Sequence, residues 1–257
     1  MSDFASLKGK RGLVVGIANE QSIAYACARE FRDLGADLAV TYLNAKAEPY
    51  VRPLAEQLEA EIIVPCDVRE PGQLEAVFEQ IRQRWGKLDF LLHSIAFAPR
   101  EDLWGRVVDC SQQGFLMAMD VSCHSFIRMA KLAEPLMSDG GTLLTVTFYG
   151  AEKVVENYNL MGPVKAALES SVRYMAAELG SKKIRVHALS PGPLKTRAAS
   201  GIDRFDQLME RTAARAPQNQ LADVRDVAAT AALLVSDRAK TLTGNIVHID
   251  AGYHIVG

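Results

Sequence analysis

The chain of 257 residues is 49% hydrophobic and 23% charged, a composition typical of a soluble globular protein. Its 29 basic and 31 acidic side chains give a formal net charge of -2 without a long run of like charge, so neither a nucleic-acid partner nor a polybasic membrane surface is indicated. The N-terminus lacks a secretion signal and no apolar stretch suits a membrane span, which predicts a cytoplasmic protein without a membrane partner. The four cysteines form no CxxC pair and lie apart from histidines, so we expect no metal site.

Short apolar, β-branched runs alternate with helical patterns along the whole chain. The strands are expected at residues 11–16, 37–42, 61–65, 88–94, 141–148, 184–190 and 245–250. The helical patterns fall at residues 22–33, 46–60, 71–85, 113–137, 158–179 and 223–236. Such alternation predicts a parallel sheet covered on both faces by crossover helices. We therefore expect one α/β domain over residues 1–257, a doubly wound Rossmann sheet of seven strands in the order 3-2-1-4-5-6-7.

Residues 191–222 form a long insertion between the sixth and seventh expected strands. Long excursions in a compact domain are usually lids or binding loops. Leu194, Ile202 and Phe205 follow helical spacing and, with Ala199, are expected to cover an apolar substrate. The alternative is that these side chains simply pack onto the sheet. We expect the insertion to be a helical substrate lid.

The turn after the first expected strand is a candidate phosphate loop. It begins at Gly16, which permits a tight turn, and leads through Ser22 into a helix. A helix N-terminus offers backbone N–H groups and a positive dipole to a pyrophosphate, and Ser22 can cap the helix or donate to phosphate. The segment departs from the G-x-G-x-x-G motif, because Glu20 and Ser22 stand where glycine is expected. An ordinary strand–turn–helix connection explains it equally well.

The residues after the second and third expected strands leave the type of dinucleotide open. Residues 41–44 contain no acidic side chain for a ribose 2′-hydroxyl, and the nearest cation for a 2′-phosphate is Lys46. Asp67 and Val68 suit the edge of an adenine ring, although a helix cap explains Asp67 equally well.

Tyr158 and Lys165 are the candidate catalytic pair. They lie at the start of a strongly periodic helical segment, and Pro163 is tolerated only near a first helical turn, so Tyr158 is expected at the mouth of the helix. Seven residues span about two turns, which places both side chains on one face, roughly 10 Å apart along the axis. This spacing suits two groups that flank a bound ribose and a reacting carbonyl. An exposed tyrosine and an unrelated lysine are the alternative for the pair taken alone.

A second tyrosine–lysine pair competes with the first. Tyr149 and Lys153 have the Tyr-x-x-x-Lys spacing of ordinary short-chain dehydrogenases, which act on ketones or alcohols. The pair begins at a strand end and contains Gly150, so no settled helix presents it, and we expect it not to be the catalytic dyad.

Taken together, these motifs resemble the enoyl-acyl-carrier-protein reductases, a branch of the short-chain dehydrogenase family. The similarity covers nearly the whole chain. The Tyr-x6-Lys spacing and the Ser-Ile-Ala loop at residues 22–24 distinguish this branch from ketoacyl reductases and from sugar or steroid dehydrogenases. The other matching segments are residues 66–68, 93–99, 192–196, 199–202 and 243–252.

The resemblance implies both halves of an active site. The cofactor side would comprise Gly16, Ser22, Ile23, Asp67, Val68, Ser94, Ile95, Ala96, Lys165, Leu194 and Thr196. The substrate side would comprise Phe97, Ala98, Phe148, Met161, Ala199, Ile202 and Phe205. The resemblance also implies NADH as cofactor, with NADPH as the alternative, an enoyl chain on acyl carrier protein as partner, a role in fatty acid biosynthesis and a homotetramer.

Three positions depart from the family pattern. Phe148 stands where the family usually has a second tyrosine, so the hydroxyl of that residue is absent here. Leu43 replaces a usual polar residue at the adenosine ribose, and Ala96 replaces a common glycine near the nicotinamide. These departures weaken any choice between the two cofactors and any expectation about inhibitors.

The implied chemistry is hydride transfer to the β-carbon of a trans-2-enoyl thioester. Negative charge then develops on the thioester oxygen, which calls for a donor such as the Tyr158 hydroxyl rather than for a nucleophile. Lys165 would hold the ribose hydroxyls and add positive potential. Two other readings stay open: a ketone or alcohol dehydrogenase using Tyr149 and Lys153, and a catalytically silent, dinucleotide-binding regulatory protein.

Overall fold

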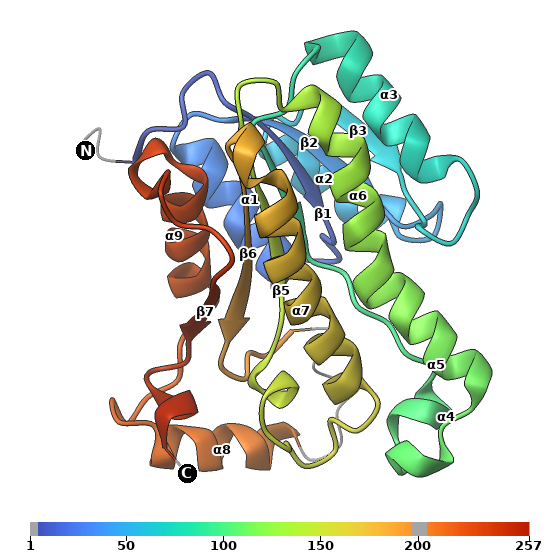
Figure 1. Ribbon diagram of the computed structural model, residues 1–257, viewed down its shortest axis with the longest axis vertical. Helices are drawn as coiled ribbons and strands as arrows, with labels where there is room; N and C mark the ends of the chain where they lie inside the picture. The colour runs from blue at the N-terminus through green and yellow to red at the C-terminus, as the bar shows by residue number, and fades with distance from the viewer. Residues whose placement is uncertain (1–4, 197–204, 257) are drawn as a thin grey trace.

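Figure 1 shows a computed structural model of the chain, which describes residues 5–196 and 205–256. Within these residues one parallel sheet has the strand order β3-β2-β1-β4-β5-β6-β7, so the expected Rossmann topology is confirmed. The strands are β1 (Arg11–Val15), β2 (Asp37–Tyr42), β3 (Ile62–Pro65), β4 (Phe90–His93), β5 (Gly141–Val146), β6 (Ile184–Pro191) and β7 (Ile246–Ile249).

Helices cover both faces of the sheet and bury two hydrophobic cores. Successive strand side chains point to opposite faces, so Leu13 and Val15 of β1 join one core and Val14 joins the other. The first core packs beneath α3 (Gln73–Trp85), α6 (Ser125–Ala133) and α7 (Met161–Leu179). The second packs beneath α1 (Ile23–Asp33), α2 (Glu48–Gln57) and α9 (Val224–Val235).

The sheet brings the candidate site residues to one edge. All its strands run parallel, so the loops after β1, β4, β5 and β6 emerge at the same carboxyl edge. The direction of the chain order reverses between β1 and β4, and such a switch point is where open α/β sheets bind ligands. The candidate phosphate loop, the segment 94–98 and the Tyr158 segment therefore converge.

The start of helix α7 differs from the expectation. Helix α7 begins at Met161, so Tyr158 lies in the turn before it and not in the helix itself. The neighbouring Asn157 and Asn159 have left-handed backbones, with φ of 65° and 41°, a conformation that interrupts a right-handed helix. The idea that Tyr158 and Lys165 sit two turns apart on one helix face is thus wrong, although both still reach the same site.

Two further segments differ from the helices that the sequence periodicity predicts. The single helix expected at 113–137 is α5 (Gln112–Met119), a π-helical turn (Asp120–His124) and α6. A short helix, α4 (Arg100–Leu103), precedes them and was not expected. Within the insertion, α8 (Phe205–Arg215) forms a helix, as predicted. None of the helices in the described ranges is both long enough and apolar enough to span a membrane.

Two buried histidines are expected to make the free energy of unfolding depend on pH. Burial lowers the pKa of His93 to about 3 and that of His187 to about 4. Both therefore stay neutral in the folded chain, whereas the unfolded chain takes up a proton near pH 6.5. We expect the free energy of unfolding to fall by up to about 2.7 kcal/mol per pH unit between pH 6 and 5, because the unfolded chain then binds up to two more protons than the folded chain.

Urea titrations at pH 7, 6 and 5 measure this slope. The matched variant His93→Gln removes one titrating group and is expected to lower the slope by one proton. An unfolding free energy that stays constant from pH 7 to pH 5 would contradict the assignment.

Candidate active site

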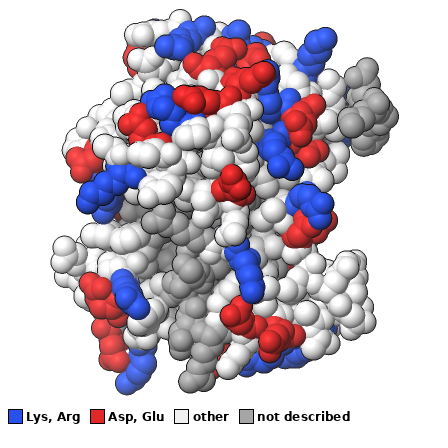
Figure 2. Space-filling view, turned by 180° about the vertical axis from the view of Figure 1, so that it is seen from behind, with Lys and Arg blue, Asp and Glu red and all other residues white. Residues whose placement is uncertain are grey.

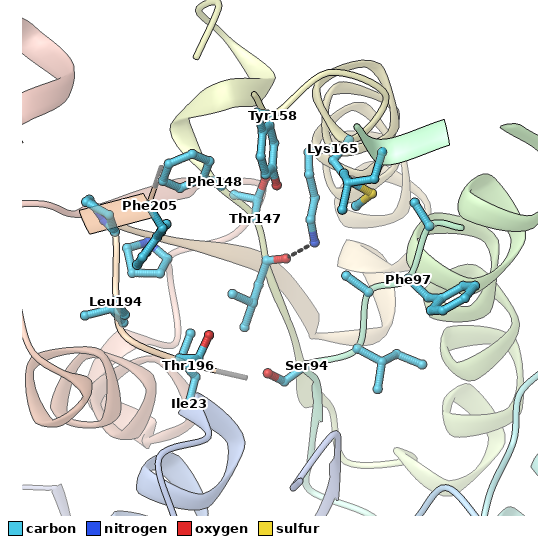
Figure 3. Close-up of a pocket in the computed structure, with 18 of the residues that line it drawn as sticks. Ile23, Ser94, Phe97, Thr147, Phe148, Tyr158, Lys165, Leu194, Thr196 and Phe205 are labelled. Carbon is cyan, nitrogen blue, oxygen red and sulfur yellow. Dashed lines mark hydrogen bonds between the residues drawn. The ribbon is translucent and has the colours of Figure 1, made fainter. Parts of the chain in front are cut away.

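A cavity of about 560 Å³ opens at the carboxyl edge of the sheet. Figure 3 shows its walls, with Ser94 and Phe97 on one side, Tyr158 and Lys165 above, and Leu194, Thr196 and Phe205 on the other. Of the predicted site residues it takes in Ile23, Ser94, Ile95, Ala96, Phe97, Ala98, Phe148, Tyr158, Met161, Lys165, Leu194, Thr196 and Phe205. The structure thus gathers cofactor and substrate candidates around one space.

Tyr158 and Lys165 are both buried in the cavity wall. Burial and the nearby Glu169 raise the pKa of Tyr158 above its usual range, so its hydroxyl remains a donor at neutral pH. Burial lowers the pKa of Lys165 to about 8, so it is still mostly an ammonium at pH 7. Its Nζ donates to the carbonyl of Val146 at 2.7 Å, which fixes the charge beside the end of β5. The pair can therefore offer a neutral donor and a positive charge.

Packing fixes the Tyr158 ring from two sides. Phe148 contacts it edge-to-face, with ring centroids 4.9 Å apart. On another side Gly150 lies so close that an added Cβ would come within 2.4 Å of the ring. The neighbouring Asn159 donates to the carbonyl of Leu103 at 2.9 Å, which ties the Tyr158 turn to α4. The aromatic ring of Phe148 thus supports Tyr158 by packing alone.

Gly150→Ala tests this packing. The new methyl group must displace the Tyr158 ring, and an error of about 1 Å in a catalytic group can lower the rate by about a hundredfold. We expect turnover to fall about tenfold to a hundredfold while NADH binding, followed by fluorescence, is retained. Gly180→Ala is the matched control, because an added Cβ there meets no atom within 4 Å. Equal turnover in both variants would show that Gly150 does not position Tyr158.

The candidate phosphate loop lies against the segment after β4. Gly16 has a φ of 116°, and a Cβ at this position would lie 2.1 Å from the carbonyl oxygen of Ser94, so only glycine fits. The Ser22 hydroxyl accepts hydrogen bonds from the backbone of Ala18 and Asn19, each at 3.0 Å, and does not cap α1. Ser22 therefore shapes the loop, while Ile23 at the start of α1 reaches the cavity.

Asp67 and Val68 lie outside the cavity lining, on the loop after β3. Arg69 holds the Asp67 carboxylate through Nε at 3.0 Å and Nη2 at 2.7 Å, and these bonds lower the pKa of Asp67. The carbonyl of Val68 accepts from Arg128 at 2.7 Å. The side chain of Asp67 is thus already paired, and its backbone N–H donates to Gln73 at 2.8 Å.

The π-helical turn supports the segment 94–98. Its Ser122 is buried, accepts from the backbone N–H of Phe97 at 2.9 Å and donates to the carbonyl of Phe97 at 3.2 Å. Phe97 itself is 45% exposed and its ring faces the guanidinium of Arg69 at 5.9 Å. The turn therefore fixes the backbone at Phe97 while leaving its ring at the cavity wall.

The insertion reaches the cavity from β6 and from α8. Leu194 and Thr196 follow β6, and Phe205 begins α8. The predicted substrate residues Ala199 and Ile202 lie outside the described residues. Leu194, Thr196 and Phe205 are therefore the predicted residues of the insertion that the structure places at the cavity.

The competing tyrosine does not face this cavity. Tyr149 lies in a short 3₁₀ turn after β5 and packs edge-to-face on Tyr253, with centroids 5.6 Å apart. Neither Tyr149 nor Lys153 contributes to the described cavity lining. Phe148 packs on Tyr158, whereas Tyr149 packs on Tyr253.

Several wall residues were not predicted. They are Arg100, Leu103, Trp104, Val146, Thr147, Pro191, Gly192 and Pro193. Arg100 and Trp104 stack with 3.8 Å between the guanidinium carbon and the ring centroid, a contact that depends on the unexpected α4. Thr147 follows β5 directly, a place that itself marks the binding edge of a parallel sheet.

Comparison with known proteins places this geometry in a family. The family model described as "Enoyl-(Acyl carrier protein) reductase" matches residues 16–254. The chain belongs to the enoyl-(acyl carrier protein) reductase family. It is 43% identical over 251 residues to enoyl-[acyl-carrier-protein] reductase [NADH] 1 of Rhizobium meliloti, with 98% of this chain and 92% of the relative covered.

Solved structures of the same family superpose closely. The reductase of Anaplasma phagocytophilum in complex with NAD has a TM-score of 0.94 at 44% identity, covering 98% of this chain and 96% of the other. The reductase of Bacillus cereus, solved with NADP+ and indole naphthyridinone, has a TM-score of 0.95 at 43% identity, with 98% of both chains covered. The expected membership in the enoyl reductase branch is confirmed.

Proposed function

We propose that this chain is an NADH-dependent enoyl-[acyl-carrier-protein] reductase that reduces the trans-2 double bond of enoyl thioesters in fatty acid biosynthesis. One observation carries the proposal: a buried phenol and a buried ammonium, Tyr158 and Lys165, line one cavity with the segment 94–98 of an enoyl reductase fold. The relative from Rhizobium meliloti is named as an NADH enzyme, and the structural neighbour from Anaplasma phagocytophilum was solved with NAD.

The residues present fit a nicotinamide dinucleotide. Gly16 lets the β1 turn pack tightly against the segment after β4, and Ile23 at the start of α1 lines the cavity, so a helix N-terminus lies near the space for a pyrophosphate. Ser94, Ile95 and Ala96 line one wall, and Lys165 provides the cation for ribose hydroxyls. We assign the cofactor to Gly16, Ser22, Ile23, Asp67, Val68, Ser94, Ile95, Ala96, Lys165, Leu194 and Thr196.

In the proposed mechanism the bound cofactor supplies a hydride for the β-carbon of the enoyl thioester. Tyr158 donates its hydroxyl hydrogen bond to the thioester oxygen, where negative charge develops as the double bond is reduced. Lys165 binds the ribose and adds a positive potential that stabilises this charge. The raised pKa of Tyr158 keeps the phenol protonated throughout the neutral range. The resulting enolate takes a proton at the α-carbon, which completes the saturated thioester.

Apolar residues supply the remaining part of the site. Phe97, Ala98, Phe148, Met161 and Phe205 line the cavity and suit an acyl chain. Ala199 and Ile202 remain predictions for the same role, and the insertion 191–222 is proposed as the substrate lid of a single domain.

The carrier protein, the oligomer and the location are proposals that follow from the family resemblance. Acyl carrier protein is the proposed donor of the enoyl chain, and a homotetramer and a cytoplasmic site are the proposed assembly and location. Figure 2 shows one face of the molecule, on which acidic and basic side chains are interspersed without an extended surface of one sign.

A cofactor-by-substrate matrix tests the proposed function. We expect the purified protein to oxidise NADH with crotonyl thioesters, and to do so faster than with acetoacetyl thioesters at equal concentration. Preference for the acetoacetyl substrate would indicate a ketone reductase instead. Tight NADH binding without turnover on thioesters of any length would favour a regulatory protein.

A further inference from the structure

A buried carboxylate, Glu169, lies directly behind the active site and has no role in the mechanism above. It is 5% exposed and accepts a hydrogen bond of 2.6 Å from the hydroxyl of Thr147, which lines the cavity. An uncompensated buried carboxylate lowers the stability of the fold by several kcal/mol, so the burial of Glu169 requires a physical explanation. No residue assignment proposed above uses it.

Glu169 and Lys165 form a paired attachment of α7 to the end of β5. They are four residues apart on α7, so their side chains lie on the same face, one turn from each other. Lys165 donates to the carbonyl of Val146, and Glu169 accepts from the hydroxyl of the next residue, Thr147. The ammonium and the carboxylate therefore attach α7 to two consecutive residues of the cavity wall.

The Thr147 hydroxyl has a fixed orientation as a consequence. Its single hydrogen points to Glu169, which leaves only its lone pairs for the cavity. Thr147 thus presents an acceptor to whatever binds beside Lys165. An ionised Glu169 has only acceptor oxygens, so it can only receive this hydrogen from Thr147.

We infer that Glu169 is a positioning residue of this active site, whose buried carboxylate orients the hydroxyl of Thr147 in the cavity wall and places a negative charge one helical turn from Lys165. The inference rests on the function proposed above. It explains why a carboxylate is buried here: a negative charge beside the two donors opposes the effect of burial on the lysine and adds to it on the tyrosine.

The groups around this pair support the assignment. Burial lowers the pKa of Lys165, and the charge of Glu169 opposes this fall. The same charge adds to burial in raising the pKa of Tyr158. Burial raises the pKa of Glu169 itself, while the bond from Thr147 lowers it. The other titratable groups that face the pair are His93 of β4, Cys123 of the π-helical turn, Glu152 of the loop after β5 and Arg173 of α7.

None of these neighbours supplies a buried negative charge in place of Glu169. His93 is neutral at physiological pH because burial lowers its pKa to about 3. Burial raises the pKa of Cys123, so its thiol is also neutral. Glu152 is exposed on the loop, where solvent screens it. Glu169 is therefore the buried anion that acts on both catalytic groups.

The test is a direct titration of Lys165 in Glu169→Gln. The amide keeps the shape and an acceptor for Thr147 but removes the charge. Labelling of Lys165 with acetic anhydride at a series of pH values, read by peptide mass spectrometry, gives its titration midpoint without any turnover. We expect the midpoint to fall relative to the unmodified protein, because the ammonium loses a nearby negative charge. The alkaline limb of the pH profile of kcat/KM should move down by the same amount.

Two variants and one measurement complete the design. Glu169→Asp retains the charge and is expected to keep the midpoint closer to that of the unmodified protein than Glu169→Gln does. Glu178→Gln, on the exposed face of the same helix, is expected to leave it unchanged. Should Glu169→Gln not fold, carbon-13 NMR of the Glu169 carboxyl in the unmodified protein decides the matter: an ionised group at pH 7 supports the inference and a protonated one overturns it.

An unchanged Lys165 midpoint in folded Glu169→Gln overturns the inference, whatever the activity. Failure of the proposed function is distinguishable, because the unmodified protein would then not reduce crotonyl thioesters although the lysine still titrates as expected.

Discussion

Tyr158→Phe is expected to lower kcat for a crotonyl thioester by about a hundredfold to a thousandfold. The variant keeps the ring that packs on Phe148 but removes the hydroxyl that faces the developing negative charge. Removal of one such donor costs about 3–4 kcal/mol of transition-state stabilisation. The measurement is NADH oxidation followed by absorbance, with NADH affinity determined separately to show that the cofactor site is intact.

Tyr149→Phe is the matched control for this prediction. Tyr149 packs on Tyr253 away from the described cavity, so its variant should keep the activity of the unmodified protein. Full activity of Tyr158→Phe together with loss in Tyr149→Phe would instead identify the second tyrosine as the catalytic one.

Lys165→Met is expected to lower NADH affinity by about tenfold to a hundredfold and to abolish most turnover. Methionine fills similar space, but the ribose loses a charge-assisted donor, an interaction of about 1.5–3 kcal/mol. The carbonyl of Val146 also loses its partner at the end of β5. Fluorescence titration with NADH measures the affinity directly.

Lys153→Met provides the comparison for the lysine. This residue is exposed on the loop after β5 and should tolerate the change without loss of NADH affinity. An equal loss of affinity in both lysine variants would mean that general charge, and not the place of Lys165, governs cofactor binding.

Sequence patterns were sufficient for the sheet because they reflect its burial. Each expected strand was an apolar run, and buried parallel strands require such runs on both faces. Gly16 was recognisable for a comparable reason, since a positive φ and a close neighbouring carbonyl admit only glycine. Tyr158 and Lys165 were found through their spacing and Phe148 through the family resemblance, and the cavity brings the three together.

The features that were missed depend on contacts between distant segments. The left-handed Asn157 and Asn159 flank Tyr158, so α7 begins only at Met161, and nothing in the periodicity of the following residues reveals this. The π-helical turn holds Phe97 through Ser122, which is 25 residues away in the chain. Glu169 belongs to the buried stripe of α7 but is polar, so a search for apolar periodicity passes over it.

The pairing of Asp67 with Arg69 is another feature that the sequence alone does not reveal. A lone aspartate after a strand is compatible with an adenine contact, but its role depends on whether a neighbouring cation already holds it. The two bonds from the Arg69 side chain answer that question only once side chains are placed.

The direct test of the whole account is the fate of the hydride. NADH that carries deuterium in the transferred position at C4 is incubated with the protein and a crotonyl thioester, and the product is examined by mass spectrometry and NMR. We predict a butyryl thioester with one deuterium at the β-carbon. Deuterium on a carbon that bears a hydroxyl group, or a substrate recovered without deuterium, would contradict the assignment of Tyr158 and Lys165 to enoyl reduction.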